Sequence, residues 1–204
     1  MEITGCHGLQ VGQDVPSFSM ETYETTNYGF GKISLEELKQ QAKWTVLFFY
    51  PADFTFVCST ELGDLAAEHQ SFLDAGAVIV TVSTDTVYTH LAWKREEKFL
   101  QEAKFLMAAD PTGNVSRLFG VYDACTGLAL RGTFIISPQG KLVASEVNYY
   151  NVGRNALELL RRVRANVYVA EHPEEACPAR WEQGSRTLTP GPELVGRVYE
   201  VLEK

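Results

Sequence analysis

The sequence predicts an α/β fold in which a central mixed β-sheet is flanked by helices and followed by an extended C-terminal arm. Apolar runs with strand character alternate with helical patterns over residues 45–119, and a hairpin pattern follows over 133–147. Alternating strands and helices favour parallel strand pairs, whereas a hairpin adds an antiparallel pair, so the sheet is expected to be mixed. A chain of 204 residues that is 45% hydrophobic can bury one sizeable core.

Three elements are expected before the first chemically informative segment. A short strand over 15–20 follows a Gly-rich, polar start. The S-x-x-E pattern that begins at Ser34 is a capping box, which predicts a short helix over 34–41. The run TVLFFY at 45–50 is continuously apolar and stops at Pro51, which is typical of a fully buried central strand.

The middle of the chain repeats the alternation of helix and strand. Residues 59–75 have apolar side chains at helical spacing, and Gly76 is a natural residue to end that helix. A buried strand is expected over 77–82, a second helix over 90–102, and a short helix over 114–119. The two histidines of these helices, His69 and His90, are interpreted as helix-surface or interface residues rather than catalysts.

The last part of the core is a hairpin followed by a long helix. The strands at 133–137 and 141–147 flank the short loop Pro-Gln-Gly, and residues 153–170 form the helix. This order of elements is typical of a thioredoxin-like fold, although other α/β folds share it.

Prolines shape the C-terminal segment. Residues 171–192 contain several of them and are expected to form an extended arm, followed by a short helix over 193–202. The expected division of the chain is therefore a domain over 1–170 and an arm over 171–204.

Composition excludes several classes of function. The net charge of −8, spread along the chain, argues against a nucleic-acid or membrane-surface binder, because such proteins cluster Lys and Arg. The start of the chain does not resemble a secretory signal, and no apolar run is long enough for a membrane span, so a cytoplasmic protein is expected. No cofactor or metal motif is present. None of the four cysteines forms a C-x-x-C pair, which argues against a zinc ribbon or a thioredoxin-type dithiol.

Cys58 is the residue with the most informative surroundings. It falls where a buried strand gives way to a helix, and the first helical turn offers unpaired N–H groups that favour thiolate over thiol. Taken alone, a cysteine beside an apolar strand would favour an inert core thiol. The neighbouring Pro51, Thr55 and Glu61 favour the reactive interpretation, because they can wall a small pocket and place a hydroxyl and a carboxylate near the sulfur.

At these residues the sequence resembles the peroxiredoxin family. Pro51, Thr55 and Cys58 match its P-x-x-x-T-x-x-C motif, and the string FYPADFTFVCSTELGDL is similar to the typical two-cysteine branch that includes the alkyl hydroperoxide reductase C subunit. The resemblance covers roughly residues 10–190. It implies a thioredoxin-like fold and an antioxidant peroxidase that uses sulfur alone, without metal, haem or other cofactor.

The resemblance also implies roles for residues outside that string. Arg131 matches the active-site arginine of the family, and Arg154 matches a second arginine that joins a network with the position of Glu61. Cys177, in the string ACPARW, resembles the resolving cysteine, which in the family reacts with Cys58 of the partner subunit.

The expected reaction is reduction of hydrogen peroxide and organic hydroperoxides. Cys58 attacks the peroxide and becomes a sulfenic acid, Cys177 condenses with it to a disulfide, and a dithiol reductant restores both thiols. Thioredoxin and a flavoprotein disulfide reductase both fit as reductants. The resemblance implies a homodimer, assembled into a decamer through residues 83–90.

Other interpretations stay open at this point. The same thiol could serve a redox sensor or an oligomeric holdase chaperone; a disulfide oxidoreductase is disfavoured by the missing C-x-x-C. Cys6 is interpreted as an incidental exposed thiol and Cys125 as a partly buried or stray loop thiol that is inert.

Two departures from the family pattern concern overoxidation and resolution. The Gly-Gly-Leu-Gly loop and C-terminal Tyr-Phe helix of peroxide-sensitive relatives are missing, which implies resistance to overoxidation. Ser59 stands where relatives commonly have proline, and we expect it to loosen the first helical turn.

Overall fold

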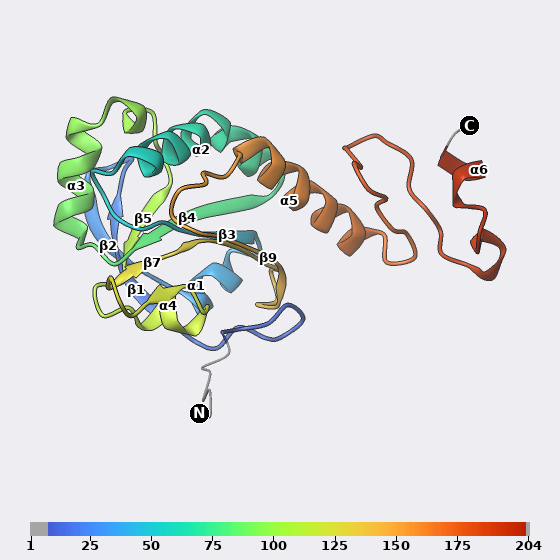
Figure 1. Ribbon diagram of the computed structural model, residues 1–204, viewed down its shortest axis with the longest axis horizontal. Helices are drawn as coiled ribbons and strands as arrows, with labels where there is room; N and C mark the ends of the chain where they lie inside the picture. The colour runs from blue at the N-terminus through green and yellow to red at the C-terminus, as the bar shows by residue number, and fades with distance from the viewer. Residues whose placement is uncertain (1–7, 203–204) are drawn as a thin grey trace. The chain divides into compact units, whose positions relative to one another are not determined.

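The computed structural model describes residues 8–202 and has an alternating α/β architecture (Figure 1). Its strands are β1 (Ser19–Glu24), β2 (Gly29–Ser34), β3 (Trp44–Phe49), β4 (Ala77–Ser83), β5 (Leu106–Ala109), β6 (Tyr122–Asp123), β7 (Leu128–Ala129), β8 (Arg131–Ile136) and β9 (Leu142–Asn148). Its α-helices are α1 (Leu35–Gln40), α2 (Phe56–Asp74), α3 (Val87–Glu96), α4 (Asn114–Leu118), α5 (Ala156–Glu171) and α6 (Val198–Leu202). Two short 3₁₀ helices are η1 (Lys98–Leu100) and η2 (Pro192–Leu194).

The main sheet is mixed, as the sequence predicts. Its seven strands lie in the order β2-β1-β5-β4-β3-β8-β9. β3 pairs in parallel with β4, and β4 with β5, whereas β8 runs antiparallel to both β3 and β9. Every residue of β3 is buried, which confirms the central position expected of the TVLFFY run.

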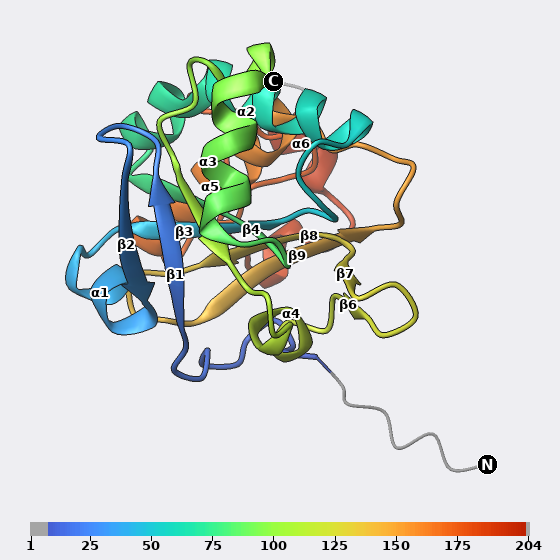
Figure 2. The ribbon, with the colours of Figure 1, turned by 90° about the vertical axis from the view of Figure 1, so that its left-hand side faces the viewer.

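Helices cover both faces of this sheet (Figures 1 and 2). α2 and α3 lie on one face, and α1 and α4 lie on the other. Side chains alternate between the two faces along a strand, so Leu47 and Phe49 of β3 point toward α1 and α4. They join a hydrophobic cluster with Leu38 of α1, Val115 of α4 and Phe134 of β8. The opposite face of β3 is buried as well, which leaves the carboxyl end of the strand as the place where polar side chains can gather.

Local signals explain where several elements begin and end. The capping box is confirmed, because the Ser34 hydroxyl accepts a hydrogen bond from the Glu37 N–H at the start of α1. Gly76 follows α2 with φ of +75°, a left-handed conformation that glycine adopts at little cost. α3 begins at Val87, earlier than expected, because Thr86 caps it through the Thr89 N–H.

The edge of the sheet departs from the expectation. The first strand begins at Ser19 rather than at residue 15, and neither β2 nor β5 is predicted from the sequence. β2 is an edge strand in which exposed and more buried residues alternate, and it contains Gly29 and Gly31, so it lacks an apolar run. β5 has only four residues, too few for a period to show.

The chain divides into two compact units, one that ends at Ala156 and one that begins at Leu157. The long helix α5 therefore falls almost entirely in the second unit, whereas the sequence places a boundary after residue 170. The assignment of a peroxidase domain and an arm to these parts stays a prediction.

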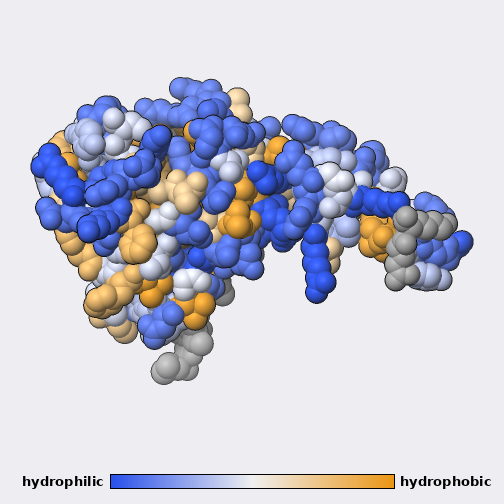
Figure 3. Space-filling model, turned by 90° about the horizontal axis from the view of Figure 1, so that it is seen from above, coloured by the Kyte–Doolittle hydropathy of each residue, from blue (hydrophilic) through white to orange (hydrophobic). Residues whose placement is uncertain are grey.

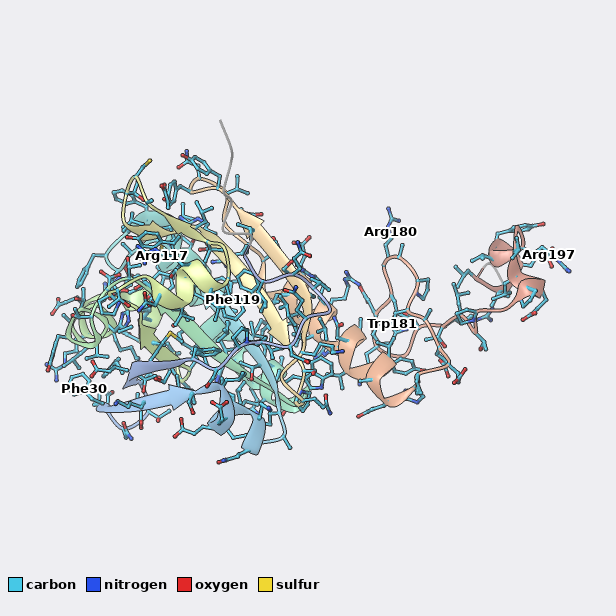
Figure 4. All side chains as sticks on the ribbon, turned by 90° about the horizontal axis from the view of Figure 1, so that it is seen from below. Phe30, Arg117, Phe119, Arg180, Trp181 and Arg197 are labelled. Carbon is cyan, nitrogen blue, oxygen red and sulfur yellow. The ribbon has the colours of Figure 1, made fainter. Side chains whose placement is uncertain are left out.

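The second unit has local structure of its own beyond α5. Trp181 is only 2% exposed, and its ring lies 5.1 Å from that of Tyr168, whereas Arg180 beside it points away from the loop (Figure 4). Ala176 and Leu188 form an antiparallel bridge that closes this loop. Trp181 is thus the anchor by which the loop that contains Cys177 packs on α5.

Hydrophilic residues predominate on the face that Figure 3 shows, with hydrophobic ones scattered among them. Within residues 8–202, no helix has the length and apolar character required to cross a membrane.

Candidate active site

Cys58 lies in the first turn of α2, directly after the carboxyl end of β3. The chain leaves β3 at Tyr50, turns at Pro51, and enters α2 at Phe56. Phe54 in this turn has φ of +57°, a left-handed conformation that is costly for a bulky residue and that recurs at functional sites. The Cys58 side chain is fully buried, so this tight turn encloses the sulfur.

A buried network of one carboxylate and two guanidinium groups adjoins the sulfur. Arg131 Nη1 donates to Cys58 Sγ at 3.3 Å and to Glu61 Oε2 at 2.5 Å. Glu61 Oε1 accepts from Arg154 Nε at 2.9 Å and from the Arg154 backbone N–H at 2.8 Å. Arg131 comes from β8, Glu61 from the second turn of α2, and Arg154 from the segment after β9. The fold therefore brings together four residues that the sequence singles out.

Backbone groups fix the two arginines in place. Arg131 Nε donates to the Tyr150 carbonyl at 2.8 Å. Arg154 donates to the carbonyls of Gly132 and Phe49 at 2.8 and 2.9 Å, and its guanidinium lies 3.4 Å above the Phe48 ring centroid. Backbone carbonyls and the Glu61 carboxylate therefore orient both guanidinium groups together.

The charges of this network sum to zero only when Cys58 is ionised. Arg131 and Arg154 carry two positive charges and Glu61 one negative charge, and all three side chains are at most 4% exposed. An uncompensated buried charge is costly, so the remaining positive charge is placed to stabilise negative charge that forms beside it. Burial lowers the pKa of Arg154, and the hydrogen bond and charge of Glu61 oppose that shift.

Thr55 and Pro51 belong to the turn that leads from β3 into α2, ahead of Cys58. Thr55 occupies the N-cap position of α2, but its hydroxyl donates to the Ala52 carbonyl at 2.7 Å instead of capping the helix. Its oxygen lone pairs thus stay available as acceptors. Pro51 is buried at the end of β3 and contributes shape rather than polar contacts.

The other cysteines have different surroundings. Cys177 belongs to the second unit, where its sulfur lies 3.9 Å from the Ala165 carbonyl of α5. Burial and the Glu175 carboxylate raise the pKa of Cys177, so its neutral thiol is favoured. Cys125 is exposed in the turn between β6 and β7, rather than partly buried. Cys6 lies outside the described residues.

A second buried polar cluster beneath the turn is not anticipated by the sequence. Asp53 Oδ1 accepts from the Tyr50 hydroxyl at 2.7 Å, and Asp53 Oδ2 lies 2.7 Å from His90 Nδ1. His90 is fully buried, so its interpretation as a surface or interface residue is wrong; His69 is partly buried. Burial raises the pKa of Asp53, whereas His90 lowers it. This cluster ties the turn that carries Phe54 and Thr55 to α3.

Comparisons with known proteins identify the family. Residues 11–145 match the model of the AhpC/TSA family. Among curated relatives, alkyl hydroperoxide reductase C of Staphylococcus saprophyticus is 41% identical over 92% of this chain and 98% of its own. The protein of the same name from Escherichia coli is 45% identical over 81% of this chain and 89% of its own.

Solved structures agree with these relatives. Enterococcus faecalis AhpC has a TM-score of 0.77 at 39% identity and covers 82% of this chain and 98% of its own. The reduced 2-Cys peroxiredoxin of Plasmodium vivax has a TM-score of 0.84 at 30% identity. The match covers 90% of this chain and 94% of that protein's chain. These matches confirm the thioredoxin-like fold and the resemblance that the motif around Cys58 indicates. The chain therefore belongs to the AhpC/TSA family and is a peroxiredoxin of the 2-Cys type.

Proposed function

We propose that this protein is a thiol-dependent peroxidase in which Cys58 reduces hydroperoxides. One observation carries the proposal: a buried guanidinium, Arg131, lies 3.3 Å from a buried sulfur in the first turn of a helix. The sulfur is thereby placed among groups that favour its anion and that can also stabilise a departing oxygen anion.

The first step is a displacement at the O–O bond. The Cys58 thiolate attacks the distal oxygen of the hydroperoxide, an S–O bond forms as the O–O bond breaks, and an alkoxide or hydroxide leaves. The leaving oxygen takes a proton from solvent, and Cys58 becomes a sulfenic acid. Arg131 and the unpaired N–H groups of the first turn of α2 hold the two oxygens and stabilise the developing charge.

Thr55 supplies the acceptor that this step needs. Because its hydroxyl proton is donated to the Ala52 carbonyl, its oxygen keeps lone pairs that can accept a hydrogen bond. It can therefore accept a hydrogen bond from the O–H of the incoming hydroperoxide and orient the distal oxygen toward Cys58. Glu61 and Arg154 act through Arg131, whose position they fix.

The second step converts the sulfenic acid to a disulfide. The Cys177 thiol attacks the Cys58 sulfur, the S–S bond forms, and water leaves. By similarity to the relatives, Cys177 comes from the partner subunit of a homodimer. A dithiol reductant then exchanges with this disulfide and restores both thiols; thioredoxin and a flavoprotein disulfide reductase remain the two candidates.

A larger assembly follows from the same similarity. We assign the contact between dimers to residues 83–90, where Tyr88 is 71% exposed. Its ring lies 5.3 Å from that of Phe30, which is also exposed, so the two rings form an apolar surface suited to a second copy of the chain. A decamer of five dimers and the cytoplasmic location stay predictions.

Peroxide consumption in the presence of a generic thioredoxin system tests the proposal. We expect Cys58→Ser to abolish consumption and Cys177→Ser to allow one turnover without thioredoxin-linked recycling. Cys125→Ser is the matched control, because it removes an exposed thiol outside the site. Full activity of Cys58→Ser would refute the proposal. Non-reducing electrophoresis with disulfide mapping after one equivalent of peroxide shows whether Cys58 pairs with Cys177 between chains.

A further inference from the structure

Ser59, the residue next to Cys58, connects the first turn of α2 to a different element. Its backbone N–H donates to the Thr55 carbonyl at 3.2 Å, which is the first intrahelical hydrogen bond of α2. Its hydroxyl lies 2.9 Å from the same carbonyl and 3.0 Å from Glu97 Oε2. The side chain is only 7% exposed. A serine at this position therefore adds a contact that extends beyond the helix.

Glu97 is itself held firmly. It ends α3, where its N–H donates to the Trp93 carbonyl, and it begins η1, where its other carboxylate oxygen accepts from the Phe99 N–H at 3.1 Å. η1 packs closely on α2, because a Cβ added at Gly63 would lie 3.1 Å from Phe99 Cβ. The carboxylate that meets Ser59 is thus held by groups that lie outside the first turn of α2.

We propose that the contact between Ser59 and Glu97 holds the first turn of α2 closed and so sets the rate at which oxidised Cys58 becomes accessible to Cys177. This inference rests on the proposed function, since it concerns the resolution step of that reaction. The Cys58 side chain is fully buried, so its sulfur reaches a second thiol only if the turn opens. Opening breaks the Ser59 N–H bond to Thr55 and the hydroxyl contact with Glu97.

The contacts of Ser59 point in the opposite direction from the expectation that it loosens this turn. Its N–H is bonded to the Thr55 carbonyl, and its hydroxyl is shared between two acceptors. A closed turn keeps the sulfenic acid in the peroxide pocket for longer. A second peroxide molecule then competes better with Cys177 for the sulfenic acid, so overoxidation of Cys58 to sulfinic acid increases.

Two variants and two matched controls test this role. Ser59→Ala removes the hydroxyl, and Glu97→Gln removes the charge but keeps an acceptor. Thr60→Ala removes the hydroxyl of the next residue, which donates to the Val57 carbonyl, and Glu96→Gln changes the exposed carboxylate next to Glu97. None of these side chains contacts Cys58 or Arg131 through a hydrogen bond, so each variant is expected to react with peroxide at the wild-type rate within twofold.

Amide hydrogen exchange of the reduced protein reports opening without any peroxide chemistry. We expect exchange at residues 58–60 to be about tenfold faster in Ser59→Ala, equivalent to about 1.4 kcal/mol, and about threefold faster in Glu97→Gln. Thr60→Ala and Glu96→Gln should exchange like the wild type at Ser59. Equal exchange in all five proteins would overturn the inference.

Rapid-quench measurements then follow the oxidised protein. Disulfide formation should accelerate by the same factors in Ser59→Ala and Glu97→Gln, and the peroxide concentration that converts half of Cys58 to sulfinic acid should rise in proportion. Faster exchange without faster disulfide formation would also overturn the role in resolution. Failure of the wild type to form a sulfenic acid would refute the proposed function instead. The exchange data would still show whether the contact between Ser59 and Glu97 holds the first turn closed.

Discussion

Replacement of Arg131 tests the electrostatic argument most directly. Arg131→Met keeps the length of the side chain but removes the donor that lies 3.3 Å from Cys58 Sγ. Glu61 keeps its partner, since Arg154 still donates to both of its oxygens at 2.9 and 3.2 Å. The buried pair of Glu61 and Arg154 is then neutral by itself, so an ionised Cys58 has no compensating charge.

The size of the effect follows from the contact that is lost. A hydrogen bond to a charged group contributes about 1.5–3 kcal/mol, and each 1.36 kcal/mol of barrier is a factor of ten in rate. We therefore expect the second-order rate of Cys58 oxidation to fall about 10- to 100-fold in Arg131→Met. Arg131→Lys keeps the charge but loses the planar guanidinium that joins Cys58, Glu61 and the Tyr150 carbonyl. Its oxidation rate should therefore lie between the rates of the wild type and Arg131→Met.

Stopped-flow oxidation in a Cys177→Ser background isolates this step from resolution. Arg117→Met is the matched control, because Arg117 stacks on Tyr122 at 3.7 Å and lies outside the site. Circular dichroism before each run verifies that the variants are folded. Rates within twofold of the wild type for both Arg131 variants would refute the reasoning, as would an equal loss in Arg117→Met.

Two further predictions concern the buried pair of Arg154 with Glu61 and the carboxylate beside Cys177. Arg154→Met should lower the free energy of unfolding by about 3–5 kcal/mol, because it removes one partner of the buried pair with Glu61; urea denaturation measures this, and a loss below about 1 kcal/mol would contradict it. Glu175→Gln should shift the alkylation of Cys177 to lower pH, because burial and the Glu175 carboxylate both raise the pKa of that thiol and only burial remains in the variant. Glu174→Gln should leave the alkylation profile unchanged, and an unchanged profile in Glu175→Gln would be evidence against the assigned cause.

Sequence patterns predicted the elements in which apolar runs or capping residues mark buried positions and helix ends. The run TVLFFY became the fully buried β3, and Ser34 capped α1 through Glu37 as its spacing indicates. β2 was missed because an edge strand with one face toward solvent needs no apolar run, and its pairing with β1 depends on backbone hydrogen bonds that residue types do not encode. The boundary expected after residue 170 is based on the proline-rich segment that follows α5, whereas the two compact units divide at the start of that helix, so the division into a domain and an arm stays a prediction.

The residues of the candidate site were predictable, but their partners were only partly so. The motif around Cys58 indicates which side chains converge, and the structure places Arg131, Glu61 and Arg154 in one network. The carbonyls of Tyr150 and Phe49 that orient the arginines carry no signal, because any residue supplies a carbonyl. His90 was misjudged for a related reason, since a helical histidine can face either way and its partner Asp53 lies far away in sequence.

The start of α2 differs from the starts of two other helices in a way that bears on reactivity. Ser34 and Thr86 use their side chains to cap α1 and α3, whereas Thr55, of the same chemical class, turns its hydroxyl to the Ala52 carbonyl. A lost cap costs a helix about 1 kcal/mol. In exchange, the N–H groups that precede the first intrahelical bond at Ser59 remain available beside Cys58. The start of α2 thus lacks the stabilisation that a side-chain cap would give. At this position, free N–H donors can instead stabilise a sulfur anion and a departing oxygen.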